Sequence, residues 1–172
     1  IQTAKLYDTD ISIVETVVKY NQKRKYDMAD KIIKIVDNKI KNKKISILGL
    51  AFKPGTDDMR DSPALDIIPK LQQAGFKISA FDPVAMKEAK SLLNNIVFSE
   101  NIEDCLKDAD ALVILTEWNE FRGLTASKLK KLMKGNILID LRNALNPENF
   151  HESEFTLTQI GRPTKKKIII NQ

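Results

Sequence analysis

The sequence predicts an α/β fold, namely a doubly wound (Rossmann-like) parallel sheet of five to six strands, preceded by a long connecting helix. Three observations lead to this prediction. Short apolar runs typical of buried strands recur along residues 45–160, stretches with helical spacing separate them, and a long helical period fills residues 10–41. Strands that alternate with helices form parallel sheets with right-handed crossovers, so a doubly wound domain follows.

The long helix is expected over residues 10–41, where apolar side chains recur at three- and four-residue steps. The apolar seam fails midway, at Asn21 and Lys25. We therefore expect a connecting helix whose C-terminal end packs on this domain and whose N-terminal end packs on something else. Two helices broken near residues 21–25 are the alternative.

The remaining elements follow in order along the chain. Ser62 and Pro63 are a helix start, with Ser at the cap and Pro in the first turn, and Gly75 ends that helix. Further helices are expected after Pro83 and over residues 102–107 and 126–133. The expected strands are residues 45–52, 77–81, 96–98, 111–115 and 137–139, with 155–160 as a sixth candidate. The domain boundaries are then 1–41 for the connecting helix and 42–172 for the α/β domain, with a candidate disordered tail after about residue 161.

Composition excludes several classes of protein and partner. The 172 residues are 42% hydrophobic and 30% charged, as in ordinary globular domains, and no apolar run is long enough to span a membrane. The net charge of +5 permits an anionic partner, but the basic residues are scattered and not interleaved with aromatic ones, so no nucleic acid is expected. Cys105 and His151 each stand alone, so we expect no disulfide, no metal site and a reducing, cytoplasmic location. The start at Ile1, without Met or a signal peptide, suggests a fragment of a longer protein.

Three polar loops follow the expected strands at residues 52–62, 116–122 and 140–143. Ligands of doubly wound sheets lie beyond the carboxyl ends of the strands, where the strand order reverses. Lys53, Arg60 and Arg142 are thereby delivered to one edge, which suits a phosphorylated ligand. The alternative is that these cations form surface salt bridges with nearby carboxylates, namely those of Asp57, Asp58, Asp61 and Asp140.

The first of these loops has no dinucleotide fingerprint. Gly49 and Gly55 stand six positions apart, with Phe52 and Lys53 between them, in place of Gly-x-Gly-x-x-Gly. Any phosphate contact here must therefore come from side chains.

Four segments resemble motifs of the nucleotide-sugar 6-dehydrogenases, the UDP-glucose/GDP-mannose dehydrogenase family. They are residues 47–65 (ILGLAFKPGTDDMRDSPAL), 81–83 (FDP), 115–122 (LTEWNEFR) and 139–143 (IDLRN). Residues 18–21 (VKYN) are similar to part of the family's central helix. Within the family, the Thr-Glu-Trp segment favours the branch acting on UDP-glucose over those acting on GDP-mannose or UDP-N-acetylmannosamine.

The resemblance implies a C-terminal domain that binds the UDP part of UDP-glucose, next to an NAD domain elsewhere in the enzyme. It implies that Phe52, Lys53 and Arg142 contact the substrate and that Arg60 reaches NAD. It also implies a homodimer formed through the central helix. The family's catalytic cysteine motif is absent and Cys105 does not match it, so this chain alone is expected to be inactive. A free-standing nucleotide-binding module is the alternative.

Overall fold

A six-stranded parallel sheet forms the centre of the computed structural model, which describes residues 2–36 and 43–164. The strand order is β3-β2-β1-β4-β5-β6, and every neighbouring pair is parallel. The order reverses between β1 and β4, which is the arrangement of a doubly wound sheet. The predicted fold class and the sixth strand are therefore confirmed. The strands are β1 Lys44–Leu48, β2 Lys77–Phe81, β3 Val97–Phe98, β4 Ala111–Ile114, β5 Ile137–Asp140 and β6 Thr156–Gln159.

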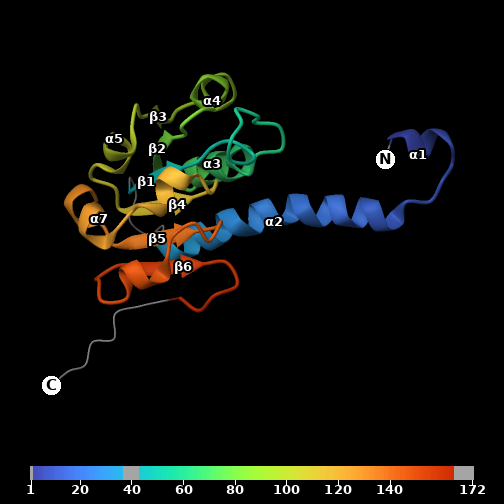
Figure 1. The fold of residues 1–172 in the computed structure, drawn as a ribbon. Helices are drawn as coiled ribbons and strands as arrows, with labels where there is room; N and C mark the ends of the chain where they lie inside the picture. Colours follow the sequence, from blue (N-terminus) through green and yellow to red (C-terminus); the bar gives the residue numbers. More distant parts are fainter. Residues whose placement is uncertain (1, 37–42, 165–172) are drawn as a thin grey trace.

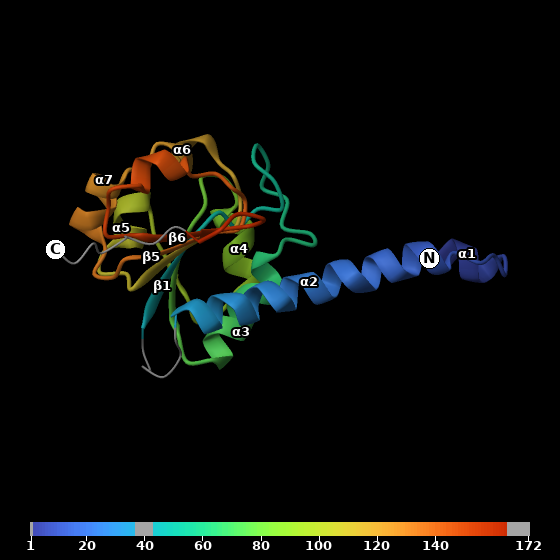
Figure 2. The same ribbon diagram turned by 90° about the horizontal axis from the view of Figure 1, so that it is seen from below.

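Helices cover both faces of the sheet (Figures 1 and 2). Side chains of β1 alternate between the two faces, with Ile45 and Ile47 on one side and Leu48 on the other. The first core lies against α2, α3 and α4, and the second against α5, α6, α7 and the 3₁₀ helix η1. These helices are α2 Ser12–Val36, α3 Ala64–Gln73, α4 Met86–Leu92, α5 Ile102–Leu106, α6 Asn119–Arg122, α7 Ala126–Leu132 and η1 Pro147–Phe150.

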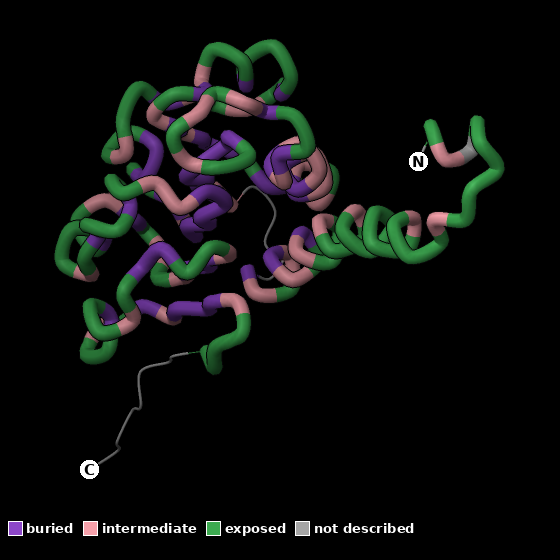
Figure 3. The backbone as a smooth tube through the Cα atoms, turned by 45° about the vertical axis from the view of Figure 1, so that its right-hand side comes forward, coloured by how far each residue is buried: buried purple, intermediate pink, exposed green. Residues whose placement is uncertain are grey.

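α2 is one unbroken helix of 25 residues, so the alternative of two helices broken near residues 21–25 is wrong. Its C-terminal half lies beside α3, and its N-terminal half extends away from the domain with α1 (Gln2–Leu6) at the far end (Figures 1 and 2). The tube in Figure 3 is mostly exposed along the outer half and buried towards the domain. The helix therefore packs on the domain at its C-terminal end, as predicted.

The polar interruption of the α2 seam has a physical reason. Lys25 forms an ion pair with Asp66 of α3 at 3.0 Å, and Gln22 Nε2 donates to the same carboxylate at 2.8 Å. These contacts lie where the helix leaves the domain, so polar partners replace apolar packing there. Residues 37–41 of the predicted helix and most of the predicted tail lie outside the described residues.

Three short elements were not predicted: α1, α6 and η1. α6 has four residues, too few for a helical period to be recognised. η1 begins with a readable signal, since the Asn146 side chain accepts from the Glu148 amide and Pro147 follows it. None of the helices in the described part of the chain is both long and apolar enough to cross a membrane.

Candidate ligand-binding site

The loop after β1 is shaped by Gly49. Its φ is +88°, and its amide donates to the carbonyl of Phe81 in β2 at 2.9 Å. A Cβ at this position would lie 2.6 Å from the Cβ of Thr116, so only glycine lets β1 end this close to the end of β4. Thr116 in turn donates its hydroxyl to the carbonyl of Ala51 at 2.6 Å. The chain thus reaches Phe52 and Lys53 at the switch point of the sheet.

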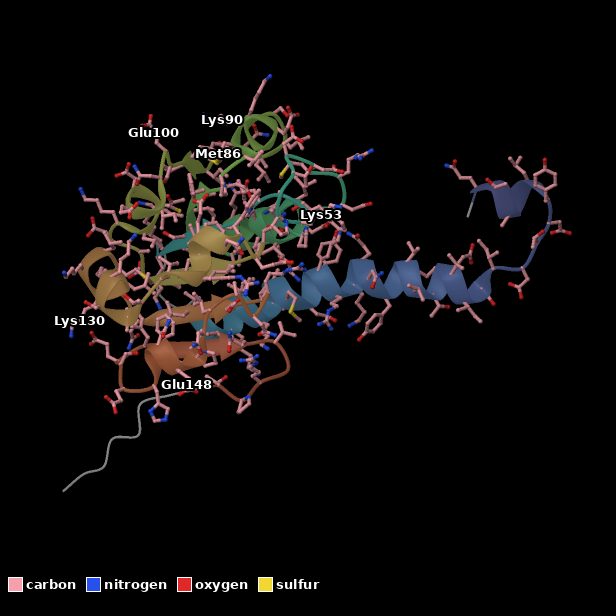
Figure 4. All side chains as sticks on the ribbon, viewed as in Figure 1. Lys53, Met86, Lys90, Glu100, Lys130 and Glu148 are labelled. Carbon is pink, nitrogen blue, oxygen red and sulfur yellow. The ribbon has the colours of Figure 1, made fainter. Side chains whose placement is uncertain are left out.

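Phe52 and Lys53 are both exposed. The Phe52 amide donates to the carbonyl of Asp58 at 2.9 Å, which closes the loop. Lys53 lies on the side of the domain from which α2 extends (Figure 4). A basic and an aromatic side chain are therefore presented next to each other at the carboxyl edge of β1.

Arg60 lies further along the same loop and is paired with Asp58. Its Nε and Nη2 donate to the Asp58 carboxylate at 3.0 and 2.8 Å. The hydrogen bonds from Arg60 lower the pKa of Asp58 from 3.8 to about 2. Arg60 lines an open cavity of about 560 Å³, formed by residues 56–60 together with Leu65, Glu88 and Leu92. The salt bridge to Asp58 is one that the sequence offered as an alternative to ligand binding.

Arg142 follows β5 and forms a two-point ion pair with Glu117, which follows β4. Its Nε and Nη2 donate to the two carboxylate oxygens at 2.5 and 2.8 Å. These hydrogen bonds lower the pKa of Glu117 below its ordinary value of 4.5. Asp140, one of the carboxylates in the salt-bridge alternative, forms no ion pair with the Arg142 side chain. This buried carboxylate accepts from Leu145 N, Gln159 Nε2 and the Arg142 amide. The hydrogen bond from the Arg142 backbone N–H to Asp140 holds the chain where it leaves β5.

Arg142 also lines a second cavity, of about 130 Å³, between α2 and the ends of β4 and β5. Its polar wall comes from α2 and its apolar wall includes Leu115 and Leu141. Sequence reasoning missed the polar α2 residues of this cavity, which are Asn21, Arg24 and Lys25. The break in the apolar seam marked Asn21 and Lys25, but nothing in the sequence marked Arg24.

The three predicted cations thus lie on loops at the carboxyl edge, but Arg60 and Arg142 line different cavities. Among residues 2–36 and 43–164, no group of three or more His, Cys, Asp and Glu could hold a metal ion. Two of the three cations are paired with carboxylates of these loops, Arg60 with Asp58 and Arg142 with Glu117.

Comparison with known proteins shows to which family the chain belongs. The sequence profile of the UDP-glucose/GDP-mannose dehydrogenase family, UDP binding domain, matches residues 46–147, which is more than half of the chain. The chain belongs to this family. The resemblance of the four sequence motifs is confirmed.

Curated relatives from bacteria match nearly the whole chain. The UDP-glucose 6-dehydrogenase of Rhizobium meliloti (strain 1021) is 42% identical over 163 residues, which are 95% of this chain and 37% of that enzyme. UDP-glucose 6-dehydrogenase TuaD of Bacillus subtilis (strain 168) is 38% identical over 164 residues, or 95% of this chain and 35% of that enzyme. The chain therefore spans little more than a third of these relatives.

Solved structures of the family have the same fold. The UDP-D-ManNAc dehydrogenase from Pyrococcus horikoshii superposes with a TM-score of 0.75 at 25% identity, covering 92% of this chain and 36% of that one. A GDP-mannose dehydrogenase from Pseudomonas aeruginosa gives a TM-score of 0.67 at 19% identity over 92% of this chain and 36% of that one, which supports the fold alone.

Cys105, the single cysteine of this family member, lies on α5 within the second core and is fully buried. Burial raises the pKa of its thiol, which keeps it protonated and weakly nucleophilic. Its position is that of a side chain in the hydrophobic core.

Proposed function

We propose that this chain is the part of an NAD-dependent UDP-glucose 6-dehydrogenase that binds the UDP moiety of the substrate. The whole enzyme would oxidise UDP-glucose to UDP-glucuronate. The observation that carries the proposal is that the segment matched by the family's UDP-binding domain, residues 46–147, contains all three loops at the carboxyl edge. The two curated UDP-glucose 6-dehydrogenases at 42% and 38% identity support this substrate.

Phe52, Lys53 and Arg142 are the proposed substrate contacts. Lys53 is exposed and free to place its ammonium group on a phosphate, while Phe52 offers an apolar wall and its backbone. Arg142 uses Nε and Nη2 for Glu117 and retains further N–H donors for oxygens of the ligand. Its ion pair with Glu117 supports this role by holding the guanidinium in one orientation.

NAD is the proposed cofactor of the whole enzyme, in which it would accept hydride from the sugar. The space beside Gly49 in this chain is already used by Thr116, so the β1 loop offers no open backbone cradle for a pyrophosphate. The contribution of this chain to NAD binding would therefore rest on Arg60, whose side chain is 89% exposed. With Cys105 buried, the chain by itself is expected not to reduce NAD.

A homodimer through α2 is the proposed assembly. The outer half of the helix exposes apolar side chains at helical spacing, among them Val14, Val17 and Val18, each about half exposed. A second copy of the same helix would cover this stripe. A cytoplasmic location, expected from the lone cysteine, stays a prediction.

Calorimetric titration of the chain with UDP and UDP-glucose tests the proposed function. We expect binding with a dissociation constant in the millimolar range, since only part of the enzyme's site is present; a millimolar constant corresponds to about −4 kcal/mol. Lys53→Ala should weaken binding by roughly 1–2 kcal/mol if a charged hydrogen bond is lost. Lys130→Ala, on α7 at the opposite side of the domain (Figure 4), is the control and should bind like the parent. Micromolar binding that is indifferent to Lys53→Ala would contradict the site.

The second candidate is a dehydrogenase of another nucleotide sugar. The solved UDP-D-ManNAc dehydrogenase with a TM-score of 0.75 favours UDP-N-acetylmannosamine in particular. Titrations with this sugar nucleotide and with GDP-mannose separate the candidates, because the preferred ligand should bind more tightly than UDP-glucose. A free-standing nucleotide-binding module would also bind UDP without a contribution from the sugar, so only the NAD-reducing activity of the whole enzyme distinguishes it from the proposed function.

A further inference from the structure

Asp82, at the end of β2, is a buried carboxylate held by N–H groups. Its side chain has no exposed surface. Oδ1 accepts from the amides of Val84 and Ala85 at 3.0 and 2.8 Å. Oδ2 accepts from the amides of Leu50 and Ala51 at 2.7 and 3.0 Å, and from the indole Nε1 of Trp118 at 3.1 Å.

The donors to Asp82 come from three different loops. Two amides belong to its own loop after β2, two to the loop after β1, and the indole to the loop after β4. The strands β2, β1 and β4 are consecutive neighbours in the sheet, and the order reverses between the last two. One side chain therefore joins the two loops that flank the switch point.

The groups that Asp82 binds are direct neighbours of the proposed substrate contacts. Ala51, whose amide donates to Asp82, immediately precedes Phe52 and Lys53. Trp118 immediately follows Glu117, and Glu117 holds the guanidinium of Arg142 at two points. The Trp118 ring also packs against both cores of the domain. Asp82 is thus connected to both halves of the site without lying in either cavity described above.

An ionised aspartate is well suited to this position. A carboxylate has two oxygens with about four acceptor sites, whereas an asparagine has only one acceptor oxygen and adds two donors. Burial of the charge would be costly alone, but five N–H donors at hydrogen-bonding distance offset that cost. An Asn at this position would put an NH₂ group in place of one carboxylate oxygen, and the N–H groups that donate to that oxygen would lose their acceptor.

We propose that Asp82 is a positioning residue that fixes the Phe52–Lys53 loop and the Glu117–Trp118 loop relative to each other, so that Lys53 and Arg142 meet one ligand together. This proposal rests on the proposed UDP site. It assigns Asp82 no contact with the ligand.

The test compares Asp82→Asn with Asp110→Asn in the whole 172-residue chain. Asp110 is a matched control, because its carboxylate accepts the Lys44 amide at 2.8 Å at the opposite, amino-terminal edge of β1. Both variants are checked for folding by circular dichroism and urea denaturation. We expect Asp82→Asn to weaken UDP binding at least about tenfold and Asp110→Asn to bind like the parent, whichever variant loses more stability.

A second measurement follows the loops directly. Trp118 is the single tryptophan, so the chain has one indole N–H resonance in a ¹H–¹⁵N spectrum. Asp82→Asn should shift this resonance together with the amides of Phe52 and Lys53, while Asp110→Asn should leave all three in place. If Asp82→Asn does not fold, Trp118→Phe removes the indole donor from the other side and should shift the Leu50 and Ala51 amides.

The outcomes separate the two proposals. A folded Asp82→Asn variant that binds UDP like the parent overturns the positioning role. A parent chain that does not bind UDP overturns the proposed function instead, and the resonances then decide whether Asp82 joins the loops. Unchanged Phe52 and Lys53 amides in Asp82→Asn, or unchanged Leu50 and Ala51 amides in Trp118→Phe, would contradict the connection.

Discussion

Arg142 donates to both carboxylate oxygens of Glu117, a residue 25 positions earlier in the chain. The pair joins the loop after β4 to the loop after β5, and both side chains are partly exposed. The cation that the family resemblance assigns to the substrate is therefore already neutralised by a carboxylate of the same site. Glu117 orients Arg142 and at the same time adds a negative charge close to where a phosphorylated ligand would bind.

Glu117→Gln should raise the affinity for UDP by about two- to fivefold. The substitution keeps the shape of the side chain but removes a charge that repels the diphosphate, an effect of about 0.4–1 kcal/mol for a screened charge pair. Calorimetric titration measures it. Glu103→Gln, which removes the carboxylate of the Glu103–Lys128 ion pair on α5 and α7, should leave affinity unchanged. Weaker binding by Glu117→Gln would show that orientation of Arg142 matters more than the added charge.

The Glu117–Arg142 pair should make stability depend on pH in the acid range. The hydrogen bonds from Arg142 lower the folded-state pKa of Glu117 below 4.5. The pair therefore stabilises the folded chain above about pH 4.5, and this contribution is lost as the pH falls through the folded pKa. Urea denaturation of the parent and of Arg142→Gln should give a difference at pH 7 that narrows towards pH 3. A difference that is constant with pH would contradict the linkage.

The order of strands and helices could be predicted because each strand is a short apolar run bounded by residues that end it. Gly75 ends α3 with a φ of +91°, as its place in the sequence indicated. The residues 111–115 form a continuous apolar segment, and β4 is fully buried on both faces. These signals are local, so a single sequence contains them.

The local pair of Arg60 with Asp58 was among the alternatives that the sequence offered. The other pairings inside the site could not be predicted, because they depend on how distant segments approach each other. Asp82 accepts hydrogen bonds from Ala51, Leu50 and Trp118, which lie 31, 32 and 36 positions away, and no sequence pattern links them to it. The same is true of Arg142, whose partner Glu117 lies 25 positions away and was not among the carboxylates that the salt-bridge alternative named. The break at Asn21 and Lys25 did indicate where α2 leaves the domain, but the partner of Lys25, Asp66 of α3, lies 41 positions away and no sequence pattern links the two.

Gly49→Ala should destabilise the chain by about 3 kcal/mol or more, because the new Cβ combines strain from a positive φ with overpacking against Thr116. Gly75→Ala is the matched control. Its φ is +91° but nothing lies within 4 Å of the new Cβ, so the loss should be only about 1–2 kcal/mol. Urea denaturation measures both. Equal losses would mean that the approach of β1 to Thr116 is not the reason for glycine.

Cys105 should react with a thiol reagent at pH 8 at least about a hundredfold more slowly in the folded chain than in urea. Burial raises the pKa of the thiol, so little thiolate is present, and the side chain is fully buried with its sulfur 3.6 Å from the carbonyl oxygen of Ile47 in β1. Because the sequence contains one cysteine, the whole signal reports this residue. A fast reaction of the folded chain would indicate an accessible thiolate and a chemical role for Cys105.

The exposed stripe on α2 should hold two copies of the chain together. Val17→Glu places a charge in the middle of this stripe, next to Val14 and Val18, and should convert a dimer into a monomer. Thr16→Glu is the control and adds the same charge at an exposed position on the opposite side of the helix. Successive residues of a helix are rotated by about 100°, so positions 14, 17 and 18 share one face and position 16 lies on the other. Sedimentation velocity should find the parent and Thr16→Glu as dimers and Val17→Glu as a monomer with unchanged domain stability. Equal masses for all three chains would show that another surface, or none, pairs the copies.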